Sequence, residues 1–459
     1  MSDQLLFGTD GIRGKANRGA MTPEMAMRVG QALVLYGQRK KGVAVPKVVI
    51  GRDTRISGPM LEMALVSGIC SMGGQAYFAG VLPTPAISYL TTVRGADFGV
   101  VISASHNPFE DNGIKIFGAD GEKLGEAEEG WISQWVLSGK IKEGERLTGA
   151  VIGLSQKYPS AARRYQHFLL KFFRNSFHLK GMRILLDCAN GAAYQVGPKL
   201  LERLGADLIV MGADPDGQNI NEQCGSLHIE RLAQKVAAEK ADLGIALDGD
   251  GDRSLFVDER GHCLTGDHIL AMMALDLDAS RRLSNRTVVA TVMSNFGFDI
   301  AMKEAGIGVV RVGVGDTQVR NEMRRGGHVL GGEQSGHTIF AEHSLNGDGL
   351  YTLLRVAELM KRRDQSLSQL ASVIEPVPQV LENVPVVERR ELNQICRLPE
   401  LIRSVESELR GKGRVLVRYS GTELLARVMI EGENFSQIDR MAKEIANCIR
   451  QEVGGQRLS

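Results

Sequence analysis

The stretch Phe98-Gly99-Val100-Val101-Ile102-Ser103-Ala104-Ser105-His106-Asn107-Pro108 decides the fold. Its first five residues form an apolar run, which is typical of a strand buried on both faces of a sheet. Polar, turn-forming residues follow at once, and in open α/β sheets ligands bind beyond the carboxyl ends of the strands. This stretch therefore predicts an α/β domain with a candidate functional loop directly after the strand.

The same alternation of apolar runs and helical stretches continues in both directions along the chain. It predicts strands at residues 47–50, 182–186, 207–210, 287–290 and 309–312, and helices at 59–72 and 194–204. Strands that are apolar throughout are expected between two layers of helices. We therefore expect three similar α/β domains.

Polar connectors mark the expected domain boundaries. Residues 138–156 form one connector, and residues 374–390 carry three of the 13 prolines, which suit extended connectors or edge strands. Strands at 414–417 and 426–430 then precede an amphipathic closing helix, whose capping box we expect at Ser436 and Asp439. The boundaries predict domains at 1–157, 158–257, 258–373 and 374–459, the last being smaller.

Composition excludes several classes of protein. The 459 residues include 55 Lys and Arg against 54 Asp and Glu, so the chain has no broad charge to attract nucleic acid or an anionic membrane. No apolar run reaches 18 residues and no signal peptide is visible, which predicts a cytoplasmic protein without a membrane span. The six scattered cysteines form no Cys-x-x-Cys pair, and we expect reduced core thiols.

A cluster of acids is the sharpest local feature, in Asp248-Gly249-Asp250-Gly251-Asp252-Arg253. Three carboxylates separated by glycines can converge on one hard divalent cation, which would also relieve their mutual repulsion. An EF-hand is disfavoured because Arg253 stands where that loop needs glycine, and because the flanking residues are typical of strands. A solvated acidic turn remains the alternative.

The loop at Ser105 and His106, with Lys115 expected further along the same loop region, allows a serine nucleophile whose charge changes are managed by its neighbours. The alternative is a serine and an asparagine that hydrogen-bond their own backbone in a turn. A hydrolase triad is disfavoured, because no G-x-S-x-G sequence surrounds Ser105 and no orienting acid stands out.

Three further glycine-rich motifs complete the set of candidate sites. In residues 331–337, GGEQSGH, polar side chains could approach sugar hydroxyls closely, and in residues 418–423, RYSGTE, with Arg427 beyond, backbone N–H groups and guanidinium groups could hold a phosphate. Residues 7–14, FGTDGIRG, add a glycine-flanked arginine. Each motif taken alone could equally be a structural turn.

Taken together, these motifs resemble those of the α-D-phosphohexomutase superfamily over nearly the whole chain. Within it, FGTDGIRG and GEQSGH resemble the phosphoglucosamine mutase group. The resemblance implies four domains around a central cleft: three similar α/β domains with mixed sheets and a smaller α+β C-terminal domain. It also implies an isomerase that interconverts glucosamine 6-phosphate and glucosamine 1-phosphate through a phosphoserine and a 1,6-bisphosphate intermediate, for UDP-N-acetylglucosamine synthesis.

The resemblance further implies a role for each candidate residue. Ser105 would become phosphoserine, and Mg²⁺ would be held by one of its phosphate oxygens together with Asp248, Asp250 and Asp252. The sugar hydroxyls would contact Glu333 and Ser335. The remaining implied residues line the reacting centre (Arg13, His106, Lys115, Arg253 and His337) or hold the phosphate that does not react (Arg418, Ser420, Gly421, Thr422 and Arg427).

Three residues depart from the usual pattern of the superfamily. Leu424 replaces a proline after SGTE, Tyr419 stands where other residues are more common, and Thr317 replaces a basic residue for which Arg320 could compensate. A phosphomannomutase or phosphoglucomutase, or a non-catalytic sugar-phosphate-binding paralogue, remain the alternatives. We expect a small-molecule hexosamine phosphate as the partner and no nucleic acid or membrane, and we consider a homodimer.

Overall fold

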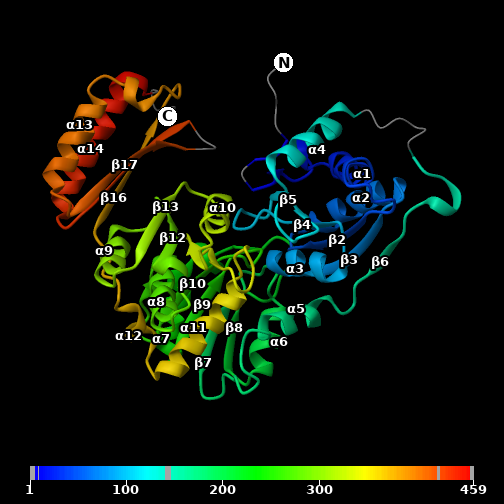
Figure 1. Cartoon of the computed structure of the whole chain (residues 1–459), viewed down its shortest axis with the longest axis horizontal. Helices are drawn as coiled ribbons and strands as arrows, with labels where there is room; N and C mark the ends of the chain where they lie inside the picture. Colours follow the sequence, from blue (N-terminus) through cyan, green and yellow to red (C-terminus); the bar gives the residue numbers. More distant parts are fainter. Residues whose placement is uncertain (1–5, 9, 140–145, 421–423, 455–459) are drawn as a thin grey trace.

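The computed structural model describes residues 6–8, 10–139, 146–420 and 424–454. Figure 1 shows four α/β or α+β units, each built around its own sheet, with the C-terminal unit on the left and the N-terminal unit at the upper right. The expected four-domain fold is confirmed. Among the described helices, none is long and apolar enough to cross a membrane.

The first domain has a six-stranded sheet in the order β1-β5-β4-β2-β3-β6. The strand quoted above is β4, which pairs in parallel with β2 and antiparallel with β5, so its carboxyl end lies in the middle of the sheet. All five residues of β4 are buried, as the apolar run predicts. The elements are β1 (Ile12–Lys15), α1 (Pro23–Lys40), β2 (Lys47–Arg52), α2 (Gly58–Ser71), β3 (Gln75–Val81), α3 (Thr84–Arg94), β4 (Phe98–Ile102), β5 (Asp111–Gly118), α4 (Glu126–Ser138) and β6 (Ser155–Lys157).

The second domain has a five-stranded sheet in the order β11-β10-β9-β7-β8. Strands β9 and β10 pair antiparallel, with Leu247 opposite Ser254, so the acidic motif forms the connection of a hairpin. An EF-hand loop joins two helices, whereas this motif joins two strands, so it is not an EF-hand. The elements are α5 (Ala161–Leu170), β7 (Arg183–Asp187), α6 (Val196–Arg203), β8 (Asp207–Met211), α7 (Ile229–Glu239), β9 (Leu243–Leu247), β10 (Ser254–Asp258) and β11 (Cys263–Leu264).

The third domain has a four-stranded sheet in the order β13-β12-β14-β15. Strand β12 pairs in parallel with β13 and β14, while β14 and β15 are antiparallel, with Gly332 opposite Thr338. The GEQSGH motif therefore connects two paired strands. The elements are α8 (Gly266–Ala279), β12 (Thr287–Thr291), α9 (Phe296–Glu304), β13 (Gly308–Val312), α10 (Asp316–Gly326), β14 (Leu330–Gly332), β15 (Thr338–Phe340), α11 (Gly349–Arg363) and α12 (Leu367–Ala371).

The fourth domain has three antiparallel strands in the order β16-β18-β17, covered by two helices. The expected capping box of its last helix is wrong. Asn434, rather than Ser436, is the N-cap, and its side chain accepts a hydrogen bond from Gln437 N at 3.0 Å, while Ser436 lies inside the helix. The elements are β16 (Gln379–Pro385), α13 (Leu398–Leu409), β17 (Gly413–Tyr419), β18 (Leu425–Gly432) and α14 (Phe435–Val453).

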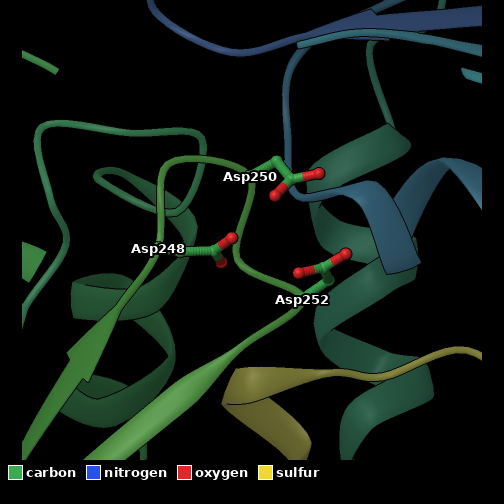
Figure 2. Close-up of side chains that lie close together, drawn as sticks. All are labelled: Asp248, Asp250 and Asp252. Atoms are coloured by element: carbon green, nitrogen blue, oxygen red, sulfur yellow. The ribbon is translucent and has the colours of Figure 1, made fainter. Parts of the chain in front are cut away.

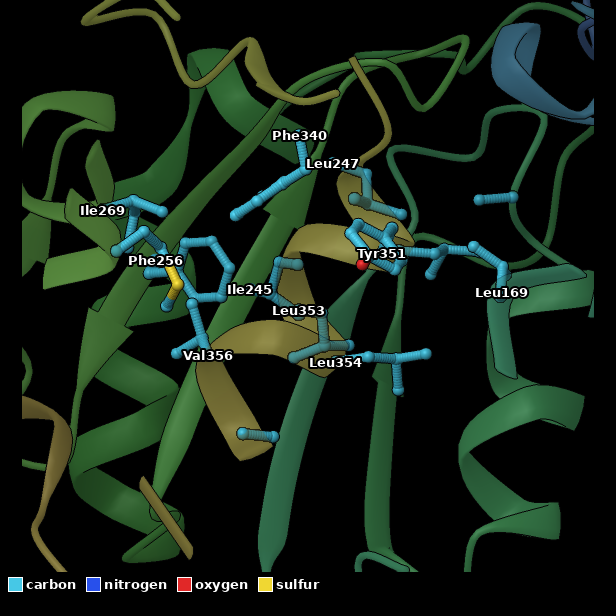
Figure 3. Close-up of a cluster of buried hydrophobic side chains, with 14 of the residues drawn as sticks. Leu169, Ile245, Leu247, Phe256, Ile269, Phe340, Tyr351, Leu353, Leu354 and Val356 are labelled. Atoms are coloured by element: carbon cyan, nitrogen blue, oxygen red, sulfur yellow. The ribbon is translucent and has the colours of Figure 1, made fainter. Parts of the chain in front are cut away.

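One hydrophobic core runs through parts of the first three domains. It extends from Val49 to Ile374 in the sequence and includes the side chains around α11 in Figure 3, where Phe256 from β10 lies near Ile269 and Val356, and Phe340 from β15 packs against Tyr351. The fourth domain has a separate core between Val380 and Val453. The first three domains are therefore held together by apolar packing, and the fourth has a core of its own.

The cysteines partly contradict the prediction of core thiols. All six are free. Cys188 and Cys224 are buried, but Cys263 and Cys396 are exposed. Spacing excludes a zinc site or a disulfide framework, but it does not report which thiols face the core.

Candidate active site

Ser105 lies just beyond the carboxyl end of β4, in a segment that we call the serine loop (residues 103–108). The residue is 2% exposed and has a φ of +55°, in the left-handed region that non-glycine residues seldom adopt. Its hydroxyl donates a hydrogen bond to Asp248 Oδ2 at 2.5 Å and lies 3.3 Å from His106 Nδ1. Residues 143 positions apart in the sequence are thus in direct contact.

The acidic motif folds into a tight connection between β9 and β10, which we call the aspartate loop (residues 248–253). Figure 2 shows the side chains of Asp248, Asp250 and Asp252 turned toward a common point. All three residues are buried, and one carboxylate oxygen of each lies within 4.8 Å of the others. Asp250 Oδ1 and Asp252 Oδ1 are buried without a hydrogen-bond partner. Buried oxygens without a partner are costly, so these residues could hold a metal ion.

A buried lysine faces this cluster. Lys115 lies on β5 rather than on a loop, is 1% exposed, and places Nζ 2.8 Å from Asp250 Oδ2 and 3.1 Å from Asp10 Oδ2. Burial alone would lower the pKa of Lys115, but Asp10 and Asp250 outweigh it and hold that pKa well above its usual range. The lysine is therefore a fixed positive charge beside the serine and aspartate loops.

Two arginines flank His106. Arg253 Nη1 lies 3.4 Å from His106 Nδ1, and Arg13 Nη1 donates to Asn107 Oδ1 at 3.4 Å. Burial, followed by the charges of Arg253 and Arg13, lowers the pKa of His106 to about 4. His106 is therefore neutral near pH 7, so that it acts as a hydrogen-bonding group and the arginines supply the charge.

The third domain brings one histidine into the same cluster. His337 Nε2 accepts a hydrogen bond from Gly347 N at 3.2 Å, which leaves Nδ1 to face Asp252 Oδ1 at 3.8 Å. Burial lowers the pKa of His337, but Asp252 outweighs it and the pKa is raised. With Nε2 as the acceptor, the ring turns Nδ1 toward the aspartates as a hydrogen-bonding group.

Glu333 and Ser335 lie at the connection between β14 and β15. Glu333 is buried, and its Oε1 accepts from Gly315 N at 2.9 Å. Its charge also acts on Arg253, whose pKa is raised chiefly by Asp252 and Asp248 against the effect of burial. Ser335 is exposed. The motif therefore presents one residue toward the cluster and one to solvent.

The arginines of the fourth domain form a pair of their own. Arg418 on β17 is directly opposite Arg427 on β18, and burial together with Arg427 lowers the pKa of Arg418. Arg418 Nη2 lies 3.8 Å from Met293 Sδ of the third domain. Like charges directly opposite each other on paired strands are destabilising. Ser420 is buried beside them, whereas Gly421 and Thr422 lie outside the described residues.

The departures from the superfamily pattern lie at three different places. The Tyr419 hydroxyl donates to Arg390 O at 2.7 Å, which ties the end of β17 to the segment after β16. Leu424 is exposed, and Thr317 is the second residue of α10. Arg320, one turn further along α10, is buried and near Asp316, so a cation does lie close to Thr317.

Sequence reasoning missed four polar residues that support the site. Thr84 Oγ1 donates to Asp250 Oδ2 at 2.6 Å, and Lys123 joins Asp10 to Asp316. The other two, Arg55 and Asn221, both donate to Ser105 O. Arg55 follows the carboxyl end of β2, the neighbour of β4, and this shared sheet edge was the one available signal.

Comparison with known families divides the chain into the same four units. Residues 4–142, 163–261 and 265–377 match the phosphoglucomutase/phosphomannomutase α/β/α domains I, II and III, and residues 381–448 match the C-terminal domain of that family. The solved phosphoglucomutase/phosphomannomutase family protein from Burkholderia thailandensis has the same fold, with a TM-score of 0.79, 22% identity and 98% of each chain covered. The N-acetylphosphoglucosamine mutase of Aspergillus fumigatus, solved with GlcNAc-6P and magnesium, superimposes with a TM-score of 0.65 at 19% identity, over 97% of this chain and 96% of the other.

Much higher identity links the chain to bacterial relatives. The phosphoglucosamine mutase of Geotalea uraniireducens (strain Rf4) is 50% identical over 450 residues, with 98% of each chain covered. The phosphoglucosamine mutase of Myxococcus xanthus (strain DK1622) is 49% identical over 448 residues, which cover 98% of this chain and 97% of the relative. The chain therefore belongs to the phosphoglucosamine mutase family, within the α-D-phosphohexomutase superfamily.

Proposed function

We propose that this chain interconverts glucosamine 6-phosphate and glucosamine 1-phosphate, with Ser105 as the residue that carries the transferred phosphoryl group. The observation that carries the proposal is the buried hydrogen bond of 2.5 Å from Ser105 Oγ to Asp248, inside a cluster of three carboxylates. Names of relatives at 47–50% identity over nearly the full chain support the amino sugar. The product would feed UDP-N-acetylglucosamine synthesis in the cytoplasm.

Asp248, Asp250 and Asp252 fit a Mg²⁺ ion. Their donor atoms are all carboxylate oxygens, and two of these oxygens are buried without a hydrogen-bond partner. With one phosphate oxygen of phosphoserine 105, they would complete a hard-oxygen ligand set. When bound, Mg²⁺ supplies positive charge that stabilises the transferring phosphoryl group.

In the first transfer, a sugar hydroxyl oxygen attacks the phosphorus of phosphoserine 105. The bond from phosphorus to the new sugar oxygen forms as the bond to Ser105 Oγ breaks, and the hydroxyl proton ends on Oγ. The product is a sugar 1,6-bisphosphate and a free serine. The bisphosphate then reverses its orientation in the site. Its other phosphoryl group is transferred to Ser105 Oγ by the reverse exchange.

The surrounding residues bind the substrate and stabilise the transferring phosphoryl group. Lys115, Arg253 and Arg13 provide fixed positive charge where negative charge spreads over the phosphoryl oxygens, and His106 and His337 complete that surface. Glu333 and Ser335 contact the sugar hydroxyls. The distal phosphate is held in the fourth domain by Arg418 and Arg427, with Ser420, Gly421 and Thr422, and these pliable guanidinium groups accept either end of the bisphosphate.

A coupled assay with glucosamine, glucose and mannose phosphates tests the substrate. Fastest turnover of glucosamine phosphate supports the proposal, and faster turnover of mannose or glucose phosphate contradicts it. Mass spectrometry of the purified protein tests the phosphoserine separately, through a shift of about 80 Da on the peptide with Ser105. A chain with neither turnover nor phosphate would be a binding paralogue. The homodimer stays a prediction.

A further inference from the structure

Two donors hold the same pair of carbonyl oxygens in the serine loop. Arg55 Nη2 donates to Ser105 O at 3.0 Å and to Asn107 O at 2.8 Å. Asn221 Nδ2 donates to the same two oxygens, at 2.9 Å and 3.0 Å. Both side chains are buried, and the amide of Asn221 can face two carbonyls only through its nitrogen. The carbonyl oxygens on either side of His106 are therefore each held by two side chains.

The two donors belong to different domains. Arg55 follows β2 in the first domain and is anchored by Asp53, whose Oδ2 lies 2.8 Å from Arg55 Nε. Asn221 lies in the second domain, between β8 and α7, and its N–H donates to Ala189 O at 2.9 Å. Only Asn221 thus shares a domain with the aspartates that Ser105 faces.

Gly249 places the aspartate loop against the same carbonyl. A Cβ at Gly249 would overlap Ser105 O and would lie 3.1 Å from Asn221 Nδ2. The serine loop, the aspartate loop and the Asn221 amide therefore meet around one oxygen atom. A shift of Ser105 O away from Asn221 would change the distance between Ser105 Oγ and Asp248.

From this arrangement we infer that Asn221 is a positioning residue for phosphoryl transfer, which sets the phosphate-bearing Ser105 against the aspartate loop. The inference rests on the proposed function of Ser105. Both hydrogens of the Asn221 amide face main-chain carbonyls, so this side chain acts through the loop. Asn221 holds the loop from the side of the aspartates, while Arg55 holds it from within the first domain.

A glycine substitution isolates this contact. Asn221 has a φ of +60°, which glycine adopts without strain, so Asn221→Gly removes both hydrogen bonds and leaves the backbone conformation accessible. Gln223→Gly is the matched control, because Gln223 is on the same loop, has a φ of +51° and is exposed. The measurements are kcat, KM for glucosamine 6-phosphate, and the single-turnover rate of transfer from phosphorylated enzyme, each per folded molecule.

We expect Asn221→Gly to lower kcat and the single-turnover rate by about ten- to a hundredfold, as misplacement of a reacting group does. KM should change little, because Arg418 and Arg427 are untouched, and the control should match wild type. If Asn221→Gly folds poorly, Asn221→Asp is the substitute test. It places an oxygen against the two carbonyls, and we expect the same loss of kcat and of the single-turnover rate. An unchanged single-turnover rate in either variant, or an equal loss in the control, overturns the inference. If wild type itself transfers no phosphoryl group, the proposed function fails instead.

Discussion

Ser105 is held in a conformation that an L-residue does not prefer. The left-handed region costs roughly 1–2 kcal/mol for a residue with a Cβ. Such conformations persist where the surrounding structure over-determines them, and here the Ser105 carbonyl accepts two buried donors while its N–H donates to Ser103 Oγ at 3.0 Å. Local strain of this kind is typical of functional sites, and it is offset by contacts from two domains.

Loss of the Ser105 hydroxyl gives the first prediction. Ser105→Ala removes the hydroxyl that we propose accepts the phosphoryl group, so turnover should fall below about one hundredth of wild type while the melting temperature stays near that of the native protein. Ser67→Ala, on the exposed face of α2, is the control. Coupled steady-state assays check this, and higher residual activity in a folded Ser105→Ala variant removes Ser105 from the covalent role.

The second prediction concerns the metal. Asp250→Asn keeps the shape of the side chain but removes one of three negative charges, so the affinity for Mg²⁺ should fall at least about tenfold, and turnover with it. Titration of activity and of bound Mg²⁺ would measure both effects. Asp207→Asn, exposed at the start of β8, should leave both unchanged. Normal activity of Asp250→Asn at limiting Mg²⁺ would mean that the aspartates serve structure.

At the scale of elements, three groups of candidate residues lie where two strands are joined or where a strand ends. The aspartate loop joins β9 to β10, GEQSGH joins β14 to β15, and the serine loop follows β4. Paired strands fix the ends of these connections to the sheet. The side chains are therefore placed by rigid elements, although most of them lie on connecting segments.

Strands β17 and β18 give the third prediction. Arg418→Ala or Arg427→Ala removes the proposed charge-assisted contact with the distal phosphate, which is worth about 1.5–3 kcal/mol. We therefore expect kcat/KM to fall roughly ten- to a hundredfold, mostly through a higher KM. Phosphate on Ser105 should remain, and mass spectrometry checks its occupancy. Arg440→Ala on α14, whose guanidinium pairs with Glu408 and Glu444, is the control. Unchanged kcat/KM in both strand variants would exclude the fourth domain from the active site.

The elements could be predicted from the sequence to different degrees. The strand at residues 98–102 was predicted to the residue because burial on both faces leaves an apolar run with polar ends. The cap of α14 was misplaced because asparagine and serine are both good caps, and Asn434 stands two residues before Ser436. The aspartate loop is predictable because its three carboxylates lie within five residues of one another. Arg55 and Asn221 were not, because their acceptors are main-chain atoms more than 45 residues away, which leave no side-chain signal.

At the scale of the whole molecule, the junctions between domains are of two kinds, apolar and polar. The first three domains share one apolar core, but the fourth meets the third through polar groups. Asn295 Nδ2 donates to Glu431 Oε1 at 3.0 Å and to Val377 O at 3.0 Å, and Arg414 donates to Ser294 O and Glu431. Polar junctions between domains permit relative motion more readily than apolar ones.

The fourth prediction tests this junction. Glu431 is fully buried, and Glu431→Gln leaves Arg414 without its carboxylate, at a cost of about 1.5–3 kcal/mol in the stability of the fourth domain. Amide hydrogen exchange should accelerate in residues 379–453 and stay unchanged in the first three domains, and KM should rise. Glu433→Gln, two residues further on and exposed, is the matched control. Uniform acceleration along the chain would mean that all four domains unfold as one unit.

The division of the core also bears on how the chain is made. The shared core is complete at Ile374, before the first strand of the fourth domain begins at Gln379. During synthesis, a nascent chain of that length already contains the serine loop, the aspartate loop and every residue of the shared core. Since domains fold as units while the chain emerges from the ribosome, the first three domains can assemble before the fourth is made. The fourth domain is then added to a core that is already complete.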